Sequence, residues 1–207
     1  GGAGADVVAG NDGNDDLSGG IGDDRLFGGG DDDRLNGDDG LDFLDGGLGA
    51  DVLRGGNGDD ELLGRSGADT LAGNDGDDVI AGGADDDLIF GGGGDDQLSG
   101  DAGNDTLNGS RGQDILTGGG GADVFVFNSV DDSPRDVSTD FAVGVDQIDL
   151  SGFGDLTFVD SYTGAGNEVR YNDAIGRLYV DIDGDSASDF SVDLTAGAGL
   201  TESDLIL

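Results

Sequence analysis

An aspartate recurs at every ninth residue from Asp6 to Asp123, and no insertion or deletion interrupts the series. Carboxylates and backbone carbonyl oxygens are the ligands that Ca²⁺, a hard cation, prefers in proteins. The spacing therefore predicts a calcium-binding turn that is repeated along the chain. The expected carboxylate ligands are Asp6, Asp15, Asp24, Asp33, Asp42, Asp51, Asp60, Asp69, Asp78, Asp87, Asp96, Asp105, Asp114 and Asp123.

A glycine stands five residues before each of these aspartates. Glycine-rich turns leave the backbone accessible, so we expect their carbonyl oxygens to complete the coordination of the metal. The glycines concerned are Gly1, Gly10, Gly19, Gly28, Gly37, Gly46, Gly55, Gly64, Gly73, Gly82, Gly91, Gly100, Gly109 and Gly118.

The unit that contains both residues reads Gly-(Gly/Asx)-x-Gly-x-Asp-x-(Leu/Ile/Val)-x and occurs fourteen times between Gly1 and Val126. A fixed period of this kind indicates a solenoid, in which each unit contacts its neighbours. We expect the last three residues of each unit to form a short strand, with the apolar eighth side chain inward, and the first six to form a turn. Two units make one coil of 18 residues. Residues 1–126 are thus predicted to form a right-handed parallel β-roll solenoid of seven coils, an all-β fold.

The second and fourth positions of the unit are expected to need a left-handed backbone, which glycine adopts most easily. The second position is Gly in eight copies and Asn or Asp in four. Arg65 and Ser110 at the second position, and Asp31 and Asp85 at the fourth, fit less well. We expect strain or an imperfect site at these four turns.

The contacts within a repeat are too few to stabilise it. One apolar side chain and a few hydrogen bonds do not offset the entropy of ordering nine residues, and stacked carboxylates repel one another. Pairing each turn with the turn two units along gives up to about twelve calcium sites. Their charge, roughly +24, would nearly cancel the −25 left by 30 acidic residues and 5 arginines in residues 1–126. Folding should therefore require calcium and be steep in its concentration.

The whole chain carries 47 acidic residues against 8 basic ones and no His, which gives a net charge of −39. This charge excludes nucleic acid as a partner and argues against anionic membranes. The chain has no cysteine for disulfides and no apolar run long enough to span a membrane. Because it starts within the repeat at Gly1, without Met, we expect it to be part of a longer protein.

Residues 127–207 lose the nine-residue period and gain aromatic and β-branched residues. Short runs there alternate apolar and polar residues, which is typical of antiparallel strands joined by Gly/Asp turns. We expect this region to be a β-rich cap over the last coil, since an open coil would expose apolar residues and free strand edges. The expected strands are Val124–Phe127, Gln147–Leu150, Glu168–Tyr171, Leu178–Ile182 and Phe190–Leu194.

Four aspartates in Asp181–Asp189 invite comparison with an EF-hand loop. That loop needs a glycine at its sixth position and a glutamate at its twelfth. Here the glycine is Gly184, at the fourth position, and the twelfth residue is Val192, so the EF-hand is excluded. A hairpin turn and a single calcium site remain as alternatives.

The fourteen repeats resemble those of RTX proteins, whose calcium-dependent β-roll is exported by type I secretion. The tail is similar to the domain that follows the repeats in serralysin-type secreted metalloproteases. The segments that carry this similarity are GADVFVF (Gly121–Phe127), TDFAVGVDQIDLSGF (Thr139–Phe153), EVRY (Glu168–Tyr171), RLYVDIDGDSASDFSVDL (Arg177–Leu194) and LTESDLIL (Leu200–Leu207).

The resemblance implies a secreted, extracellular protein whose partners are calcium ions, the type I secretion apparatus and an upstream domain of the same protein. It also implies that residues 127–207 cap the roll and carry an uncleaved secretion signal, because Asp204–Leu207 is similar to the terminus of the family. Enzymatic activity is not implied. A zinc protease of this kind needs an HExxH helix, and a chain without His cannot form one.

We therefore expect a non-catalytic domain that folds when it binds calcium outside the cell and supports the export and folding of an upstream domain. Two alternatives remain open. One is a polysaccharide-binding accessory module like the repeat modules of alginate epimerases, which also resemble these repeats. The other is an adhesin or surface-layer segment. Phe27, Phe43 and Phe90 point outward in the predicted roll, but they are too few and too irregularly spaced for a sugar-stacking platform.

Overall fold

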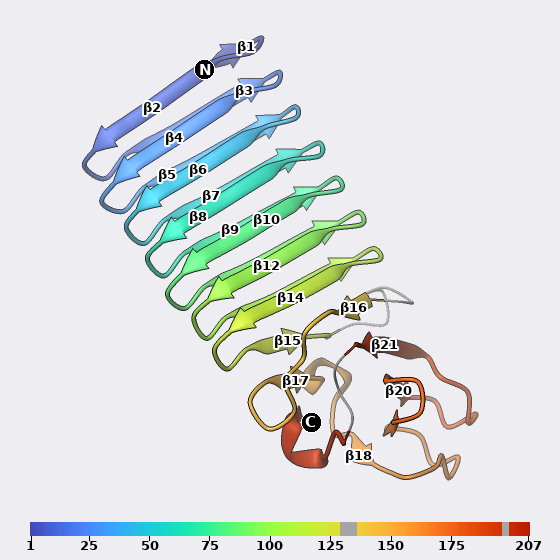
Figure 1. The fold of residues 1–207 in the computed structure, drawn as a ribbon. Helices are drawn as coiled ribbons and strands as arrows, with labels where there is room; N and C mark the ends of the chain where they lie inside the picture. The colour runs from blue at the N-terminus through green and yellow to red at the C-terminus, as the bar shows by residue number, and fades with distance from the viewer. Residues whose placement is uncertain (129–135, 196–198) are drawn as a thin grey trace.

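The computed structural model describes residues 1–128, 136–195 and 199–207. Two sheets face each other across a flattened coil, and the coils are stacked from the N-terminus toward the tail (Figure 1). Consecutive strands of the repeats belong alternately to the two sheets. Helical structure in the described residues is limited to two 3-10 turns, η1 (Ser151–Phe153) and η2 (Glu202–Asp204).

One sheet has ten strands in the order β1-β3-β5-β7-β9-β11-β13-β15-β17-β22. Its strands are Gly2–Ala3 (β1), Asp16–Ile21 (β3), Arg34–Asp39 (β5), Val52–Asn57 (β7), Thr70–Asp75 (β9), Leu88–Gly93 (β11), Thr106–Arg111 (β13), Val124–Val126 (β15), Gln147–Asp149 (β17) and Leu205–Ile206 (β22).

The other sheet has twelve strands in the order β18-β19-β20-β21-β16-β14-β12-β10-β8-β6-β4-β2. Its strands are Val7–Asp12 (β2), Arg25–Gly30 (β4), Phe43–Leu48 (β6), Glu61–Ser66 (β8), Val79–Ala84 (β10), Gln97–Ala102 (β12), Ile115–Gly120 (β14), Asp136–Ser138 (β16), Thr157–Phe158 (β18), Glu168–Asn172 (β19), Arg177–Asp181 (β20) and Phe190–Leu194 (β21).

The register confirms the predicted coil. All strand pairs within the repeats are parallel, and each residue lies beside the residue 18 positions along, as Leu26 does beside Leu44 and Ile80 beside Leu98. Fourteen units at this spacing make seven coils. The parallel β-solenoid predicted from the period is therefore the fold that is observed.

The eighth side chain of each unit forms the core, as expected. From Leu26 to Phe125 these side chains are at most 2% exposed. Val8 and Leu17 in the first coil are only partly buried, because no coil of this chain covers them on the N-terminal side. One column of apolar side chains therefore runs along the axis of the stack.

The predicted division into a three-residue strand and a six-residue turn is wrong. Each strand from β2 to β14 has six residues, which are positions seven to nine of one unit and one to three of the next. In Val7–Asp12, Gly10 interrupts the register between Ala9 and Asn11, and pairing then resumes. Only positions four to six form the turn between the sheets. Glycine at positions one and two suggested a turn, but these residues continue the ladder.

The left-handed backbone predicted for the second and fourth positions is confirmed. Arg65 has a φ of 83° and Ser110 one of 71° at the second position, while Asp31 has 73° and Asp85 has 78° at the fourth. Side chains rarely tolerate this conformation, so these four residues, two in strands and two in turns, carry backbone strain that glycine would avoid.

The tail is only partly antiparallel, and this corrects the expectation for two of its strands. Strands β19, β20 and β21 form an antiparallel meander. By contrast, β15 and β17, in the runs Val124–Phe127 and Gln147–Leu150, are parallel to the repeats and to β22. The tail therefore continues both sheets before it folds over the last coil (Figure 1). The described part of the chain contains no helix long and apolar enough to span a membrane.

Candidate metal centre

The sixth-position aspartates form one column along each edge of the stack, because the 18-residue coil brings every second copy into line. From Asp24 to Asp123 they are at most 3% exposed, while Asp6 and Asp15 in the first coil are half-buried. Burial of so many carboxylates is costly unless each oxygen has a partner.

One oxygen of each buried carboxylate has a partner in the chain. The backbone N–H of an aspartate donates to Oδ1 of the aspartate 18 residues further along, as Asp60 does to Asp78 at 2.8 Å. This bond recurs at 2.6–3.0 Å from Asp6 to Asp123. The ladder fixes the orientation of each carboxylate relative to the previous coil.

The other oxygen, Oδ2, is buried and accepts no hydrogen bond from the described residues at eleven of these positions. Buried polar atoms in native proteins nearly always have a partner, and an ionised one needs it most. A column of such atoms points to a ligand that the chain does not supply. The positions are Asp15, Asp24, Asp33, Asp42, Asp51, Asp60, Asp69, Asp78, Asp87, Asp96 and Asp105.

The glycine that opens each unit lies against this oxygen. A Cβ atom added at Gly28 would collide with Oδ2 of Asp33 and come within 2.6 Å of the carbonyl oxygen of Gly46 in the next coil. At Gly64 the same clash would occur with Asp69, and a carbonyl oxygen would again be 2.5 Å away. A carboxylate oxygen and a carbonyl oxygen from adjacent coils thus converge on space that only glycine leaves open. Both are hard oxygen donors of the type that calcium binds.

Burial and the stacking of like charges raise the pKa of several of these carboxyl groups. Burial, followed by the charges of Asp114 and Asp78, raises the pKa of Asp96 to about 8, although a backbone hydrogen bond opposes the shift. A divalent cation would stabilise the ionised form and reverse this effect. Burial likewise raises the pKa of other members of the column, to about 7 for Asp60, Asp69 and Asp87 and to about 6 for Asp78 and Asp105.

Two aspartates outside the repeats extend the column, and the sequence analysis missed them. The N–H of Asp114 donates to Oδ1 of Asp136 at 3.0 Å, and that of Asp123 donates to Oδ1 of Asp146 at 3.1 Å. In Asp146 the second oxygen accepts the N–H of Ala142 at 2.7 Å. On the edge of the stack that ends at Asp146, both oxygens of the last carboxylate therefore accept hydrogen bonds from backbone N–H groups.

The aspartates of the tail hairpin lie close together. Oxygens of Asp181, Asp183 and Asp189 are within 4.8 Å of one another. Both oxygens of Asp181 accept backbone N–H groups, from Gly184 at 2.8 Å and Ser186 at 3.1 Å. Because these bonds organise the turn between β20 and β21, the geometry favours the hairpin alternative.

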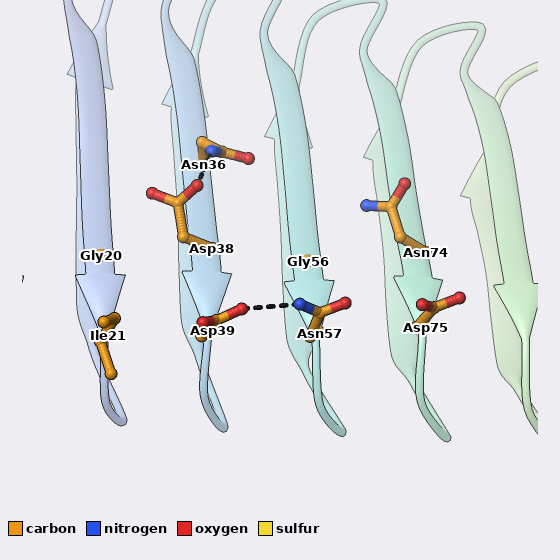
Figure 2. A pocket seen from close by; sticks show the side chains of 9 residues that line it. All are labelled: Gly20, Ile21, Asn36, Asp38, Asp39, Gly56, Asn57, Asn74 and Asp75. Carbon is orange, nitrogen blue, oxygen red and sulfur yellow. Dashed lines mark hydrogen bonds between the residues drawn. The ribbon is translucent and has the colours of Figure 1, made fainter.

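A groove of about 670 Å³ lies on the outer side of the ten-stranded sheet near the ends of its strands (Figure 2). Its polar side chains are partly paired with one another, as Asn57 is with Asp39 at 2.6 Å. Three of its nine lining residues are aspartates and none is basic. The groove would repel an anionic polysaccharide.

The outward phenylalanines do not form one platform. The ring centres of Phe27 and Phe43 are 5.7 Å apart on the twelve-stranded sheet. The guanidinium of Arg25 lies 4.4 Å from the centre of the Phe43 ring. Phe90 lies on the other sheet, in β11.

Comparison with known proteins agrees with this geometry. Residues 1–207 match the family described as "Peptidase M10 serralysin C terminal". Serralysin G of Dickeya chrysanthemi is 43% identical over 82 residues, which are 36% of this chain and 17% of that protein, so the chain corresponds to a small part of its length. The solution structure of the AlgE6R3 subunit from the Azotobacter vinelandii mannuronan C5-epimerase is 36% identical, with a TM-score of 0.50 over 68% of this chain and 80% of that one. The chain therefore belongs to the serralysin C-terminal family of peptidase M10, with an RTX-type β-roll that is consistent with calcium binding.

Proposed function

We propose that this chain is a folding module that becomes structured when calcium fills its turns, and that it supports the export and folding of an upstream domain of a secreted protein. The observation that carries the proposal is the column of buried Oδ2 atoms facing glycine carbonyls. Without a cation these oxygens would have to be protonated or left without a partner. The metal would therefore contribute directly to the free energy of folding.

The proposed ligands are Oδ2 of the sixth-position aspartates from Asp6 to Asp123 and the carbonyl oxygens of the first-position glycines from Gly1 to Gly118. Up to about twelve ions would lie between successive turns, each supplying the positive charge that two neighbouring coils lack. Since each interior coil faces a coil on both sides, one bound ion would order the turn needed by the next.

A requirement of calcium for folding would be useful during export from the cell. In calcium-poor cytosol a self-repelling chain of net charge −39 would remain unfolded and could pass through a narrow type I secretion channel. In millimolar extracellular calcium it would fold. The secretion signal is assigned to the end of the chain, Asp204–Leu207, of which Leu205–Ile206 pairs with β17 in the folded protein.

The proposed division of labour follows the sequence pattern: residues 1–126 form the calcium-loaded roll and residues 127–207 cap it. In support of this, the tail has apolar contacts of its own, such as the Phe127 and Phe190 rings at 5.5 Å. It also covers the last coil of both sheets.

A polysaccharide-binding module is the second candidate, because the similar AlgE6R3 chain is a subunit of an epimerase that acts on mannuronan. The acidic groove of Figure 2 argues against an anionic glycan. Calorimetry with acidic and neutral polysaccharides, in the presence of calcium, distinguishes the folding module from the polysaccharide-binding module. A polysaccharide that binds with a micromolar dissociation constant would favour the polysaccharide-binding module.

The folding proposal is tested by far-ultraviolet circular dichroism during a calcium titration. We expect a disordered spectrum in EDTA and a steep transition to a β-rich spectrum as calcium rises. A β-rich spectrum already present in EDTA at neutral pH would overturn the proposal.

A further inference from the structure

A second column of hydrogen bonds runs beside the aspartate column, made by the fifth residue of the unit. Oδ1 of Asp77 accepts the N–H of Asp95 at 2.8 Å, and Oδ1 of Asp95 accepts the N–H of Gln113 at 2.8 Å. In the coil before, Asp59 accepts the N–H of Asp77 at 3.0 Å. The fifth position was not singled out by the repeat pattern, because its residue type varies.

The two columns run in opposite directions. The N–H of Asp77 donates to the preceding coil, to Asp59, whereas the N–H of Asp78 donates to the following coil, to Asp96, at 2.8 Å. Two successive peptide groups of one turn are therefore held by carboxylates from both neighbours. This pair of bonds fixes how far the turn stands from each neighbour and how it is rotated.

The bond requires a side-chain oxygen acceptor but not a charge. Asn104 makes it through its amide oxygen, to the N–H of Ala122 at 2.9 Å. Units with Ala or Leu at the fifth position, such as Ala68 and Leu41, offer no acceptor. Among the described residues the bond occurs at seven positions, namely Asp23, Asp32, Asp59, Asp77, Asp86, Asp95 and Asn104.

We propose that the fifth residue is a positioning residue for the calcium sites: its side-chain oxygen holds the next turn so that the carboxylate and carbonyl oxygens of adjacent coils converge. The inference rests on the proposed calcium-dependent folding and adds a second determinant to it. It distinguishes turns that are already oriented for the ion, such as those of Asp77 and Asp95, from turns that lack the bond.

The experiment adds and removes this acceptor and follows two quantities: urea unfolding at fixed saturating calcium, and the rate of calcium release after mixing with a chelator. Ala68→Asn adds an acceptor opposite the N–H of Asp86 without adding charge. We expect it to lower the unfolding constant roughly two- to tenfold, the range for one hydrogen bond, and to slow calcium release. Ala122→Asn is the matched control, because the corresponding N–H, that of Val145, already donates to Ala142 at 3.0 Å.

Removal of the acceptor gives the reverse test. Asp77→Ala should raise the unfolding constant and speed calcium release, while Asp77→Asn, which keeps an acceptor oxygen, should restore most of both. Equal effects of Asp77→Ala and Asp77→Asn, together with no difference between Ala68→Asn and Ala122→Asn, would overturn the inference. Failure of the unmodified protein to fold with calcium would instead overturn the proposed function.

Discussion

Buried carboxylates in the repeats and in the tail have different partners. Asp69 in the repeats is 2% exposed, and only its Oδ1 accepts a hydrogen bond from the described chain, from Asp51 at 2.7 Å. Asp204 in the tail is 3% exposed and accepts N–H groups of Gly144 and Thr201, both at 2.8 Å, and the Thr201 hydroxyl at 2.7 Å. In the tail both oxygens of Asp204 accept hydrogen bonds, whereas in the repeats one oxygen of Asp69 accepts none from the described residues.

The pKa values of the two groups show the consequence. Burial raises the pKa of Asp69 to about 7, and the charges of Asp87 and Asp51 add to the shift. Burial also acts on Asp204, but hydrogen bonds from Thr201 and Gly144 outweigh it and leave the pKa below its usual value. Two carboxyls of similar exposure therefore have opposite pKa shifts: stronger desolvation and neighbouring charges raise the pKa of Asp69, and hydrogen bonds lower that of Asp204.

The tail also has denser apolar packing than the repeats. Each repeat contributes one core side chain per nine residues, whereas the tail brings several aromatic rings together, with Phe153 and Phe127 at 5.3 and 5.5 Å from Phe190. The tail should therefore depend less on metal than the repeats do.

Removal of calcium should separate the two regions most clearly. All three tyrosines, Tyr162, Tyr171 and Tyr179, lie in the tail, so near-ultraviolet circular dichroism of tyrosine reports on the tail while the far-ultraviolet signal reports mainly on the repeats. In a titration with EDTA we expect loss of most of the β signal, and loss of the tyrosine signal only at lower free calcium. Simultaneous loss of both signals would mean that the tail has no stability of its own.

Blocking the space beside a carboxylate should have the next largest effect. A Cβ at Gly91 would clash with Oδ2 of Asp96 and come within 2.7 Å of the carbonyl oxygen of Gly109. Gly91→Ala should lower the free energy of unfolding in calcium by about 1–3 kcal/mol or more. Gly93 in the same strand is the control, since its nearest such atom, Oδ1 of Asp75, is 3.9 Å away. Urea denaturation that shows equal losses for Gly91→Ala and Gly93→Ala would contradict the assignment.

Neutralising one ligand should weaken calcium-dependent stability more than neutralising an exposed acid. Asp78→Asn keeps an oxygen for the N–H of Asp60 but loses the charge expected to bind the ion. We expect an unfolding free energy in calcium lower by on the order of 1–3 kcal/mol, measured by urea denaturation. Asp160→Asn makes the same charge change at an exposed residue of the tail and should have little effect. Equal unfolding free energies for Asp78→Asn and Asp160→Asn would show that the aspartate column acts only through net charge.

A fall in pH should partly replace the metal in stabilising the folded repeats, and we expect this effect to be the smallest of the four. A raised pKa means that the folded repeats bind protons more tightly than the unfolded chain, so this stability is complete below the ordinary aspartate pKa of 3.8 and is lost as pH rises through about 6 to 8. In metal-free buffer the β signal should therefore increase as the pH falls from 8 to 5. A metal-free spectrum that is independent of pH would contradict the raised pKa values.

The strict period explains why much of the roll could be predicted from the sequence. The spacing of Leu26 and Leu44 sets the coil length, and the aspartates at the same spacing must line up once the coil is known. The predicted strand length was wrong, because a glycine such as Gly10 has no side chain whose apolar or polar character would show that it continues the strand.

The end of the column was missed for a different reason. Asp136 follows Asp123 by 13 residues, which breaks the period. In addition, buried Ser138 pairs with Leu116 where the repeats have an apolar residue, so the apolar pattern is lost as well. A search for Asp followed two residues later by an apolar residue, without a fixed spacing, would have found Asp146 and Ile148.

The most direct test of the account is a crystal structure of the chain grown in calcium, with the ions located by anomalous scattering. We expect peaks along both edges of the stack, between the Oδ2 atom of an interior aspartate such as Asp69 and the carbonyl oxygen of the neighbouring coil, at calcium–oxygen distances of about 2.3–2.6 Å. Well-ordered turns whose Oδ2 atoms contact only water would contradict it.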